Sequence, residues 1–217
     1  MSFRRMAAWF GVAFVAVNVI GFALGGSPPA PEDGPAEIVR YIEDGGSTLK
    51  VGLLVSGLGM LLFLVYIAGF VAMVRSGDRA RGEAYGLVVL LAAVLAAGLA
   101  SVGLLANAVL ALRGVSSLEP ATTRLTWDLS MVAYGLGMTF VVPLGLASAV
   151  AVLQRGLLPR WFGYLSVVVG VLGFSGFASV VYGSNLSSLA FAGYAGLLVW
   201  VLAGAVALLR EAEPQVA

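Results

Sequence analysis

Long apolar runs alternate with short polar segments along the whole chain. A membrane-spanning helix needs about 20 apolar residues to cross about 30 Å of hydrocarbon. Runs of this kind cover roughly residues 6–25, 50–74, 84–112, 128–153, 161–182 and 187–209. Aspartate, glutamate, lysine and arginine stand only at the rims of these runs. The pattern therefore predicts an all-α, polytopic membrane protein in which residues 1–217 form a single domain of six transmembrane helices.

The longest polar stretch is the predicted outer loop, residues 26–49, between the first two runs. Within it, Pro35 suits the first turn of a helix, and Ile38, Val39 and Ile42 fall on one side of that helix. The glycine pair at 45–46 would end it. We expect a short interfacial helix that lies on the outer face of the membrane.

The distribution of arginine and lysine predicts the orientation, because cytoplasmic loops carry an excess of both. With the N-terminus inside, the cytoplasmic segments hold Arg4, Arg5, Arg75, Arg79, Arg81, Arg155, Arg160 and Arg210, and the outer segments hold Arg40, Lys50, Arg113 and Arg124. Both termini are therefore expected inside. Trp127 and Tyr182 would fall near the outer interface, where aromatic side chains gather. The predicted location is the plasma membrane, the inner membrane of a bacterium, in a multi-pass arrangement.

The first run admits a second interpretation as a cleaved signal peptide. Arg4 and Arg5 precede an apolar stretch that ends in small residues. That stretch is nearly twenty residues long, whereas the apolar region of a signal peptide is about 7–15 residues. A retained first helix is the favoured interpretation.

Composition narrows the chemistry that the chain can perform. Of the 217 residues, 60% are hydrophobic and 11% are charged, and the chain has neither histidine nor cysteine. These absences exclude Cys/His metal sites, histidine-ligated haem, thiolate chemistry and a Ser-His-Asp triad. A net charge of +1 gives no reason to expect nucleic acid as a partner. No catalytic, cofactor-binding or metal-binding residues are predicted, so we expect a protein that is not an enzyme and needs no cofactor.

Polar residues gather in one layer at the predicted outer ends of the helices. The candidate ligand or polar-layer residues are Asn107, Arg113, Arg124, Asp128, Thr139, Tyr182 and Asn185. One interpretation is a rim ion pair between Asp128 and Arg113 or Arg124. The other is a site for an anion, a lipid head group or a small molecule that opens outward. The two differ in whether the face running from Asp128 through Gly135 to Thr139 borders a cavity.

Small residues and one proline indicate how the helices pack. Ala96, Ala100, Gly103 and Asn107 share one helix face, and similar strips recur in the first, second and fifth runs. Asn18 and Asn107 are expected to form hydrogen bonds across helices. Small residues let helix backbones approach closely in lipid, so these strips predict helix contacts, with a glycine-lined crevice as the alternative. Pro143 leaves the carbonyl of Thr139 without its helical partner and predicts a kink.

Several segments together resemble a known family. They are the outer segment "PPAPEDGPAEIVRYIEDGG", the helix "TLKVGLLVSGLGMLLFLVYIAGFVAMVR", the later "GLLPRWFGYLSVVVGVLG" and the terminal "LLVWVLAGAVALLR". This layout resembles the small actinobacterial integral-membrane proteins grouped as domain of unknown function 4386. The resemblance covers most of the chain and implies a six-helix inner-membrane protein. It implies no reaction, ligand or catalytic residue.

Two functions follow from these features as expectations. The first is a non-catalytic accessory or partner-binding role in the lipid bilayer, in which small-residue strips also serve a homo-oligomer or another membrane protein. The alternative is a carrier or receptor for a lipid-like or small amphipathic molecule bound at the outer mouth. A cavity that reaches from the outer mouth to membrane depth would discriminate between them.

Overall fold

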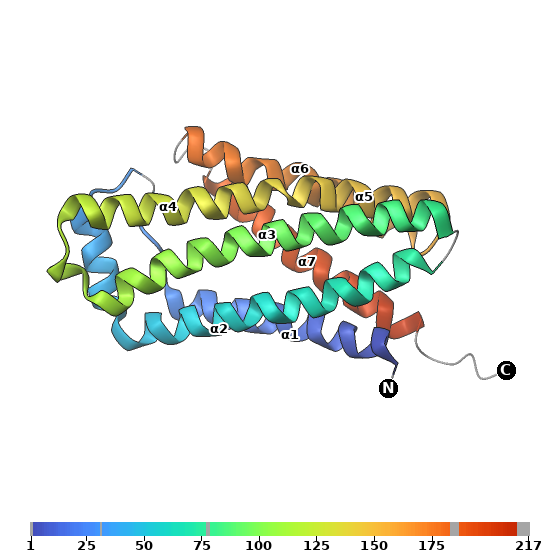
Figure 1. Ribbon diagram of the computed structural model, residues 1–217, viewed down its shortest axis with the longest axis horizontal. Helices are drawn as coiled ribbons and strands as arrows, with labels where there is room; N and C mark the ends of the chain where they lie inside the picture. Colours follow the sequence, from blue (N-terminus) through green and yellow to red (C-terminus); the bar gives the residue numbers. More distant parts are fainter. Residues whose placement is uncertain (1, 31, 77–78, 183–186, 212–217) are drawn as a thin grey trace.

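The computed structural model describes residues 2–30, 32–76, 79–182 and 187–211. Every regular element in these residues is helical (Figure 1). The elements are α1 (Phe3–Gly25), α2 (Pro35–Arg75), α3 (Arg79–Arg113), the 3₁₀ turn η1 (Val115–Ser117), α4 (Pro120–Thr139), α5 (Val141–Arg155), α6 (Arg160–Tyr182) and α7 (Ser187–Glu211). The predicted all-α fold class is confirmed for the described residues.

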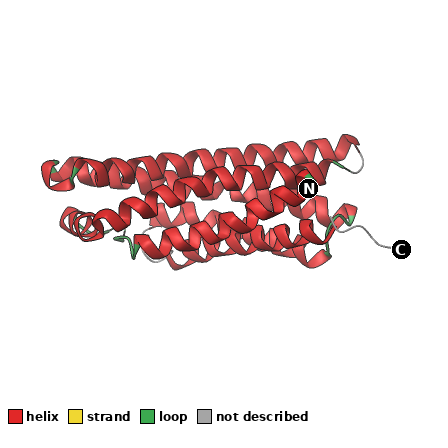
Figure 2. Ribbon diagram, turned by 90° about the horizontal axis from the view of Figure 1, so that it is seen from below, coloured by secondary structure: helices red, strands yellow, loops and turns green. Residues whose placement is uncertain are grey.

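The long helices form one elongated bundle and run roughly along its axis, whereas the short helix at the start of α2 lies across one end (Figures 1 and 2). We call the end that carries residues 26–30, 32–46 and 114–119 the cap end, and the opposite end the termini end. The start of α1 and the end of α7 lie together at the termini end, where Gly11 contacts Ala205. The described chain therefore runs the length of the bundle six times, with α4 and α5 forming one pass.

Among the described residues, five helical segments are long and apolar enough to cross a membrane. They are Phe3–Gly25, Pro35–Arg75, Gly82–Arg113, Pro120–Arg155 and Phe191–Arg210. Large apolar side chains cover the outside of the bundle, including Leu54 at 76% exposure and Leu112 at 74%. Such a surface is stable only in contact with lipid tails, so the chain is a membrane protein.

The short cap-end helix is present, but it is joined to the following helix without a loop. α2 starts with Pro35 in its first turn and changes direction at Gly46, whose φ of 45° and ψ of −125° lie outside the helical region. Ile38 and Ile42 are buried, as the pattern predicted. The long part of α2 begins directly after Gly46, because glycine at this position allows the chain to turn within a single residue.

The fourth pass differs from its predicted bounds at both its start and its middle. It begins at Pro120, ahead of the predicted start at residue 128, because Pro120 occupies the first helical turn after Glu119. It then breaks between Thr139 and Val141, and the Phe140 amide bonds instead to the Gly137 carbonyl. The helix is therefore interrupted three residues before Pro143, where the proline predicts a kink.

An aromatic group fills the middle of the bundle toward the termini end. It consists of Tyr66, Phe70, Phe162 and Trp200, all fully buried, with ring centroids 5.1–6.2 Å apart. The indole nitrogen of Trp200 donates to the Ser166 hydroxyl at 2.8 Å. These rings join α2, α6 and α7 and leave little room between the helices there.

The predicted small-residue strips lie at helix contacts. A Cβ added to Gly145 of α5 would lie 2.8 Å from Gly170 Cα of α6, and one added to Gly52 of α2 would lie 3.2 Å from the Gly21 carbonyl of α1. Backbones this close leave no space for a side chain. Gly145 and Gly52 therefore hold neighbouring helices together within the monomer. Ala96, Ala100 and Gly176 of the predicted strips also line the cavity described below, as the alternative of a small-residue crevice predicts.

Replacing Gly145 by alanine should destabilise the bundle. The added methyl group would meet the α6 backbone at Ser166 and Gly170, which cannot move aside as a flexible side chain can. We expect a loss of about 1–3 kcal/mol, typical of overpacking, seen as a lower midpoint of thermal unfolding in detergent. Gly98→Ala is the matched control, because nothing lies within 4 Å of its added Cβ. An equal effect of both substitutions would contradict the close-contact explanation.

Candidate functional site

A cavity of about 430 Å³ lies between the helices in the half of the bundle nearer the cap end. Residues of α1, α2, α3, α4, α6 and α7 line it, together with residues from the start of α5. Its volume is in the range of about 300–1,000 Å³ that is usual for small-molecule sites. Sites between the helices of a bundle are a common location for such ligands.

The cavity extends from the cap end well into the membrane-spanning part of the bundle. On α1 its lining runs from Gly25 to Phe14, which is about 16 Å at a rise of 1.5 Å per residue. Its deep end is formed by Phe63, Leu144 and Leu197, which pack against the aromatic group. The cavity therefore has an apolar floor, and we call its opposite end, which lies near the cap end, the mouth.

The described cavity lining contains no aspartate, glutamate, lysine or arginine. Most of the wall is apolar, from phenylalanine, leucine, methionine, alanine and glycine. The polar side chains are few: Asn18, Tyr41, Ser56, Asn107, Trp127, Tyr134, Ser179 and Tyr194. A mainly apolar wall with a few placed polar groups is typical of sites for neutral organic molecules.

Asn18 on α1 already has its hydrogen bonds within the protein. Its amide nitrogen donates to the Phe14 carbonyl at 2.9 Å, and its side-chain oxygen accepts from the Tyr194 hydroxyl at 2.6 Å. The bond to Tyr194 joins α1 to α7. The sequence-based expectation that Asn18 bonds across helices is confirmed.

Asn107 and Trp127, on facing helices α3 and α4, have unpartnered polar atoms. Trp127 is 1% exposed, and its indole Nε1 has no hydrogen-bond partner. The buried Oδ1 of Asn107 also has none, although the Asn107 side chain lies within hydrogen-bonding reach of the Tyr134 hydroxyl. Leaving a polar atom of this kind buried without a partner costs about 1–3 kcal/mol. The cavity wall therefore holds an unused donor and an unused acceptor.

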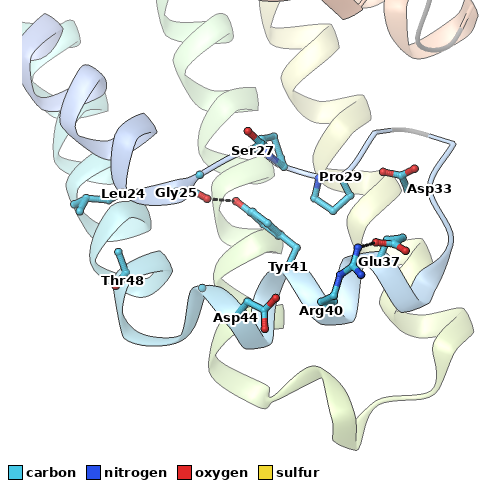
Figure 3. A pocket seen from close by; sticks show the side chains of 13 residues that line it. Leu24, Gly25, Ser27, Pro29, Asp33, Glu37, Arg40, Tyr41, Asp44 and Thr48 are labelled. Atoms are coloured by element: carbon cyan, nitrogen blue, oxygen red, sulfur yellow. Dashed lines mark hydrogen bonds and ion pairs between the residues drawn. The ribbon is translucent and has the colours of Figure 1, made fainter.

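A second, more open cleft of about 600 Å³ lies at the cap end (Figure 3). Its walls are the end of α1, the following loop and the short helix of α2. Asp33, Glu37 and Asp44 line it together with Arg40, and Arg40 is paired with Glu37. The cleft is polar and wide, in contrast to the cavity below it.

Tyr41 stands between the cleft and the cavity. It lines both, as do Gly25, Gly26 and Pro28. Its hydroxyl donates to the Gly25 carbonyl at 2.8 Å (Figure 3), and its ring meets the Trp127 ring edge-on with centroids 5.8 Å apart. The Tyr41 side chain therefore ties the short helix to the end of α1 where the two spaces adjoin.

Two of the predicted site residues form an ion pair at the rim. Arg124 Nε lies 2.9 Å from the Asp128 carboxylate, one turn further along α4. Arg124 also donates to the backbone carbonyl of Asp33 in the first cap-end loop. Of the two interpretations of Asp128, the geometry matches the rim ion pair, and Asp128 does not line the cavity.

The other site residues expected from the sequence do not gather at one place in the structure. Asn107 lines the cavity, whereas Arg113 is exposed and Tyr182 is 72% exposed. Thr139 donates its hydroxyl to the Gly135 carbonyl at 3.3 Å and is not part of the cavity lining. Asn185 lies outside the described residues. On the face from Asp128 to Thr139, the residue that borders the cavity is Gly135.

Tyr41, Trp127 and Tyr194 are three of the polar lining residues that were not among the site residues expected from the sequence. Tyr41 and Tyr194 gave no signal, because an isolated tyrosine in or beside an apolar run is unremarkable. Trp127 was expected at the lipid interface, but it is buried beneath Tyr41 because the short helix folds over it. The described residues also contain no group of three or more His, Cys, Asp or Glu side chains that could hold a metal ion.

The two members of the rim pair should differ in their effect on stability. Asp128→Asn removes one partially exposed ion pair, which is worth about 0.2–1 kcal/mol. Arg124→Gln also removes the bond to the Asp33 carbonyl and should destabilise the protein more. Thermal unfolding of both variants in detergent measures the difference. A larger loss for Asp128→Asn would contradict the assignment of Arg124 as the link between the α4 start and the cap-end loop.

Comparisons with protein-family models, with curated proteins and with solved structures found no match to this chain. The resemblance to the domain of unknown function 4386 therefore stays a prediction. The function has to be argued from the residues and the geometry of the chain itself.

Proposed function

We propose that the chain is a non-catalytic, multi-pass membrane protein that binds a small, largely apolar molecule in the cavity, as a receptor or a carrier. The observation that supports this most directly is the cavity itself. It is apolar, it extends into the membrane-spanning part of the bundle, and its mouth adjoins a polar cleft. Of the two functions expected from the sequence, the geometry favours the alternative one.

The cavity is unusual for a bundle held by such close helix contacts. Protein interiors are normally packed to the density of organic crystals, and an empty apolar space loses the contacts that its walls would make. Here α1 and α2 touch through Gly21 and Gly52, but the space between them and α4 stays open. An apolar occupant would restore contacts along this wall.

The chemistry of the wall favours a neutral occupant and argues against ion-coupled pumping. Secondary transporters usually place ionisable groups near the middle of the membrane. The described cavity lining has no carboxylate, amine or guanidinium group. A receptor or a carrier driven by the ligand's own gradient needs none.

We propose that the ligand enters from outside the cell. The arginine and lysine distribution favours the termini end on the cytoplasmic side of a bacterial plasma membrane, which puts the cap end and its cleft outside. The cleft then leads to the cavity past Tyr41. Movement of the short helix away from the bundle, with Gly46 as the hinge, would open this path.

An accessory role toward another membrane protein has less support. It was expected from the small-residue strips, and these strips make contacts within the monomer. The apolar outer surface does not favour it either, because any lipid-exposed bundle needs such a surface. We therefore place ligand binding first.

Filling the cavity should displace the bound molecule. Ala100 on α3 lines the cavity, and Ala100→Phe would place a ring in it. We expect occupancy by 1-decanol, used as a neutral apolar probe, to fall at least about tenfold, because overpacking by an occupant costs about 1–3 kcal/mol. Native mass spectrometry of the purified protein measures occupancy, and also detects any molecule that co-purifies from the membrane.

The matched control is Val102→Phe, which adds a ring on the outer side of the same helix, where Val102 is 45% exposed. It should leave occupancy unchanged. If wild type, Ala100→Phe and Val102→Phe retain the probe equally, the cavity is not its binding site and the proposed function fails.

Removing the Tyr41 hydroxyl should speed ligand exchange. Tyr41→Phe keeps the ring against Trp127 but removes the bond to the Gly25 carbonyl, which is worth about 0.5–1.5 kcal/mol. We expect entry and release of tritiated 1-decanol to accelerate about three- to tenfold, while equilibrium occupancy changes little. Tyr182→Phe, at a highly exposed position, serves as control. Unchanged exchange in Tyr41→Phe would exclude this tyrosine as the barrier.

A further inference from the structure

We infer that the occupant of the cavity carries an uncharged hydroxyl-type head group, held between Trp127 on α4 and Asn107 on α3. This inference rests on the proposed function and specifies the class of ligand. Its evidence is separate from the cavity volume: it comes from the polar atoms of the wall that have no partner. Because these atoms lie toward the mouth, the inference also gives the ligand an orientation.

The register of α3 against α4 puts the two side chains at the same level. A Cβ on Gly137 would lie 3.1 Å from the Ala96 carbonyl, and one on Gly103 would lie 3.0 Å from the Ser130 carbonyl. In these antiparallel helices, the residue numbers of two facing positions therefore add up to about the same value. One further turn toward the cap end brings Asn107 opposite the turn that contains Trp127, and both line the cavity.

The two side chains offer complementary hydrogen-bonding groups. The Nε1–H of Trp127 is a donor without an acceptor, and Oδ1 of Asn107 is an acceptor without a donor. Both atoms are buried, so the side chains of Trp127 and Asn107 must rotate before an occupant of the cavity can bond to them.

A hydroxyl group fits this pair better than other simple head groups do. It accepts one hydrogen bond and donates another, so one oxygen can serve both Trp127 and Asn107. A carboxylate only accepts and an ammonium only donates. Each would also bring an unpaired charge into a wall whose described residues supply no countercharge. An alkane would leave both protein atoms unpartnered.

The rest of the cavity is consistent with a single head-group position. Asn18 and Tyr194, on the other side, already bond to each other. The floor at Phe63, Leu144 and Leu197 has no polar side chain. The apolar body of the ligand would therefore extend toward the floor, with its hydroxyl in the half nearer the mouth.

The experiment compares probes that differ only in their head group. The binding of 1-decanol, decane, decanoate and decylammonium to the detergent-purified full chain is measured by native mass spectrometry and by thermal stabilisation. For the wild-type protein we expect 1-decanol to bind about three- to tenfold more tightly than decane. Decanoate and decylammonium should bind more weakly than 1-decanol.

Two substitutions should remove this preference without abolishing binding. Trp127→Phe keeps an aromatic ring and Asn107→Leu keeps a side chain of similar size, so decane should bind to both variants as to wild type. The ratio of 1-decanol to decane affinity should fall toward one in each. Tyr66→Phe is the matched control, because the Tyr66 hydroxyl is also buried and unpartnered but is not part of the cavity lining. It should leave the ratio unchanged, and circular dichroism checks that each variant is folded.

The outcomes separate this inference from the proposed function. A wild-type ratio near one, or tighter binding of either charged probe, would overturn the hydroxyl assignment while leaving the cavity as a ligand site. A preference for 1-decanol that survives both Trp127→Phe and Asn107→Leu would overturn the assignment of these residues. Failure of all four probes to bind, with no molecule co-purifying, would count against both proposals.

Discussion

The structure depends on how closely helix backbones approach one another in an apolar solvent. Lipid tails offer no hydrophobic drive for helix association, so contact between backbones and good van der Waals packing must supply it. Gly145 against Gly170, and Gly21 against Gly52, are such contacts. They fix neighbouring helices as pairs, and the residues that face the bundle axis then decide whether its centre is filled.

The size of these axial residues changes along the bundle. Toward the termini end, the centre holds Tyr66, Phe70, Phe162 and Trp200. Toward the cap end, the inward positions on α2, α3 and α4 include small residues such as Ser56, Ala100 and Gly135. Helices fixed by their neighbours cannot collapse onto these short side chains, so a cavity remains there.

At the cap end, the backbone conformation of one residue positions the helix that covers the mouth of the cavity. At Gly46 the chain leaves the short helix and enters the long part of α2 within one residue. This turn folds the short helix over the mouth, where Ile38 and Ile42 pack beside Trp127 and Tyr41 reaches the end of α1. The same contact that closes the mouth buries the indole of Trp127.

The sequence by itself determined the helical class, the apolar runs, the kink before Pro143 and the small-residue contacts, because each depends on residues close together in the chain. It also indicated Asn18 as a link between helices and a rim pair for Asp128. The tertiary structure decided that Asn107 and Trp127 meet at one level of a cavity, and that Asp128 stays outside it. These relations depend on the register and spacing of helices far apart in sequence. Hydropathy is nearly uniform around such helices, so it contains little information about which face points inward.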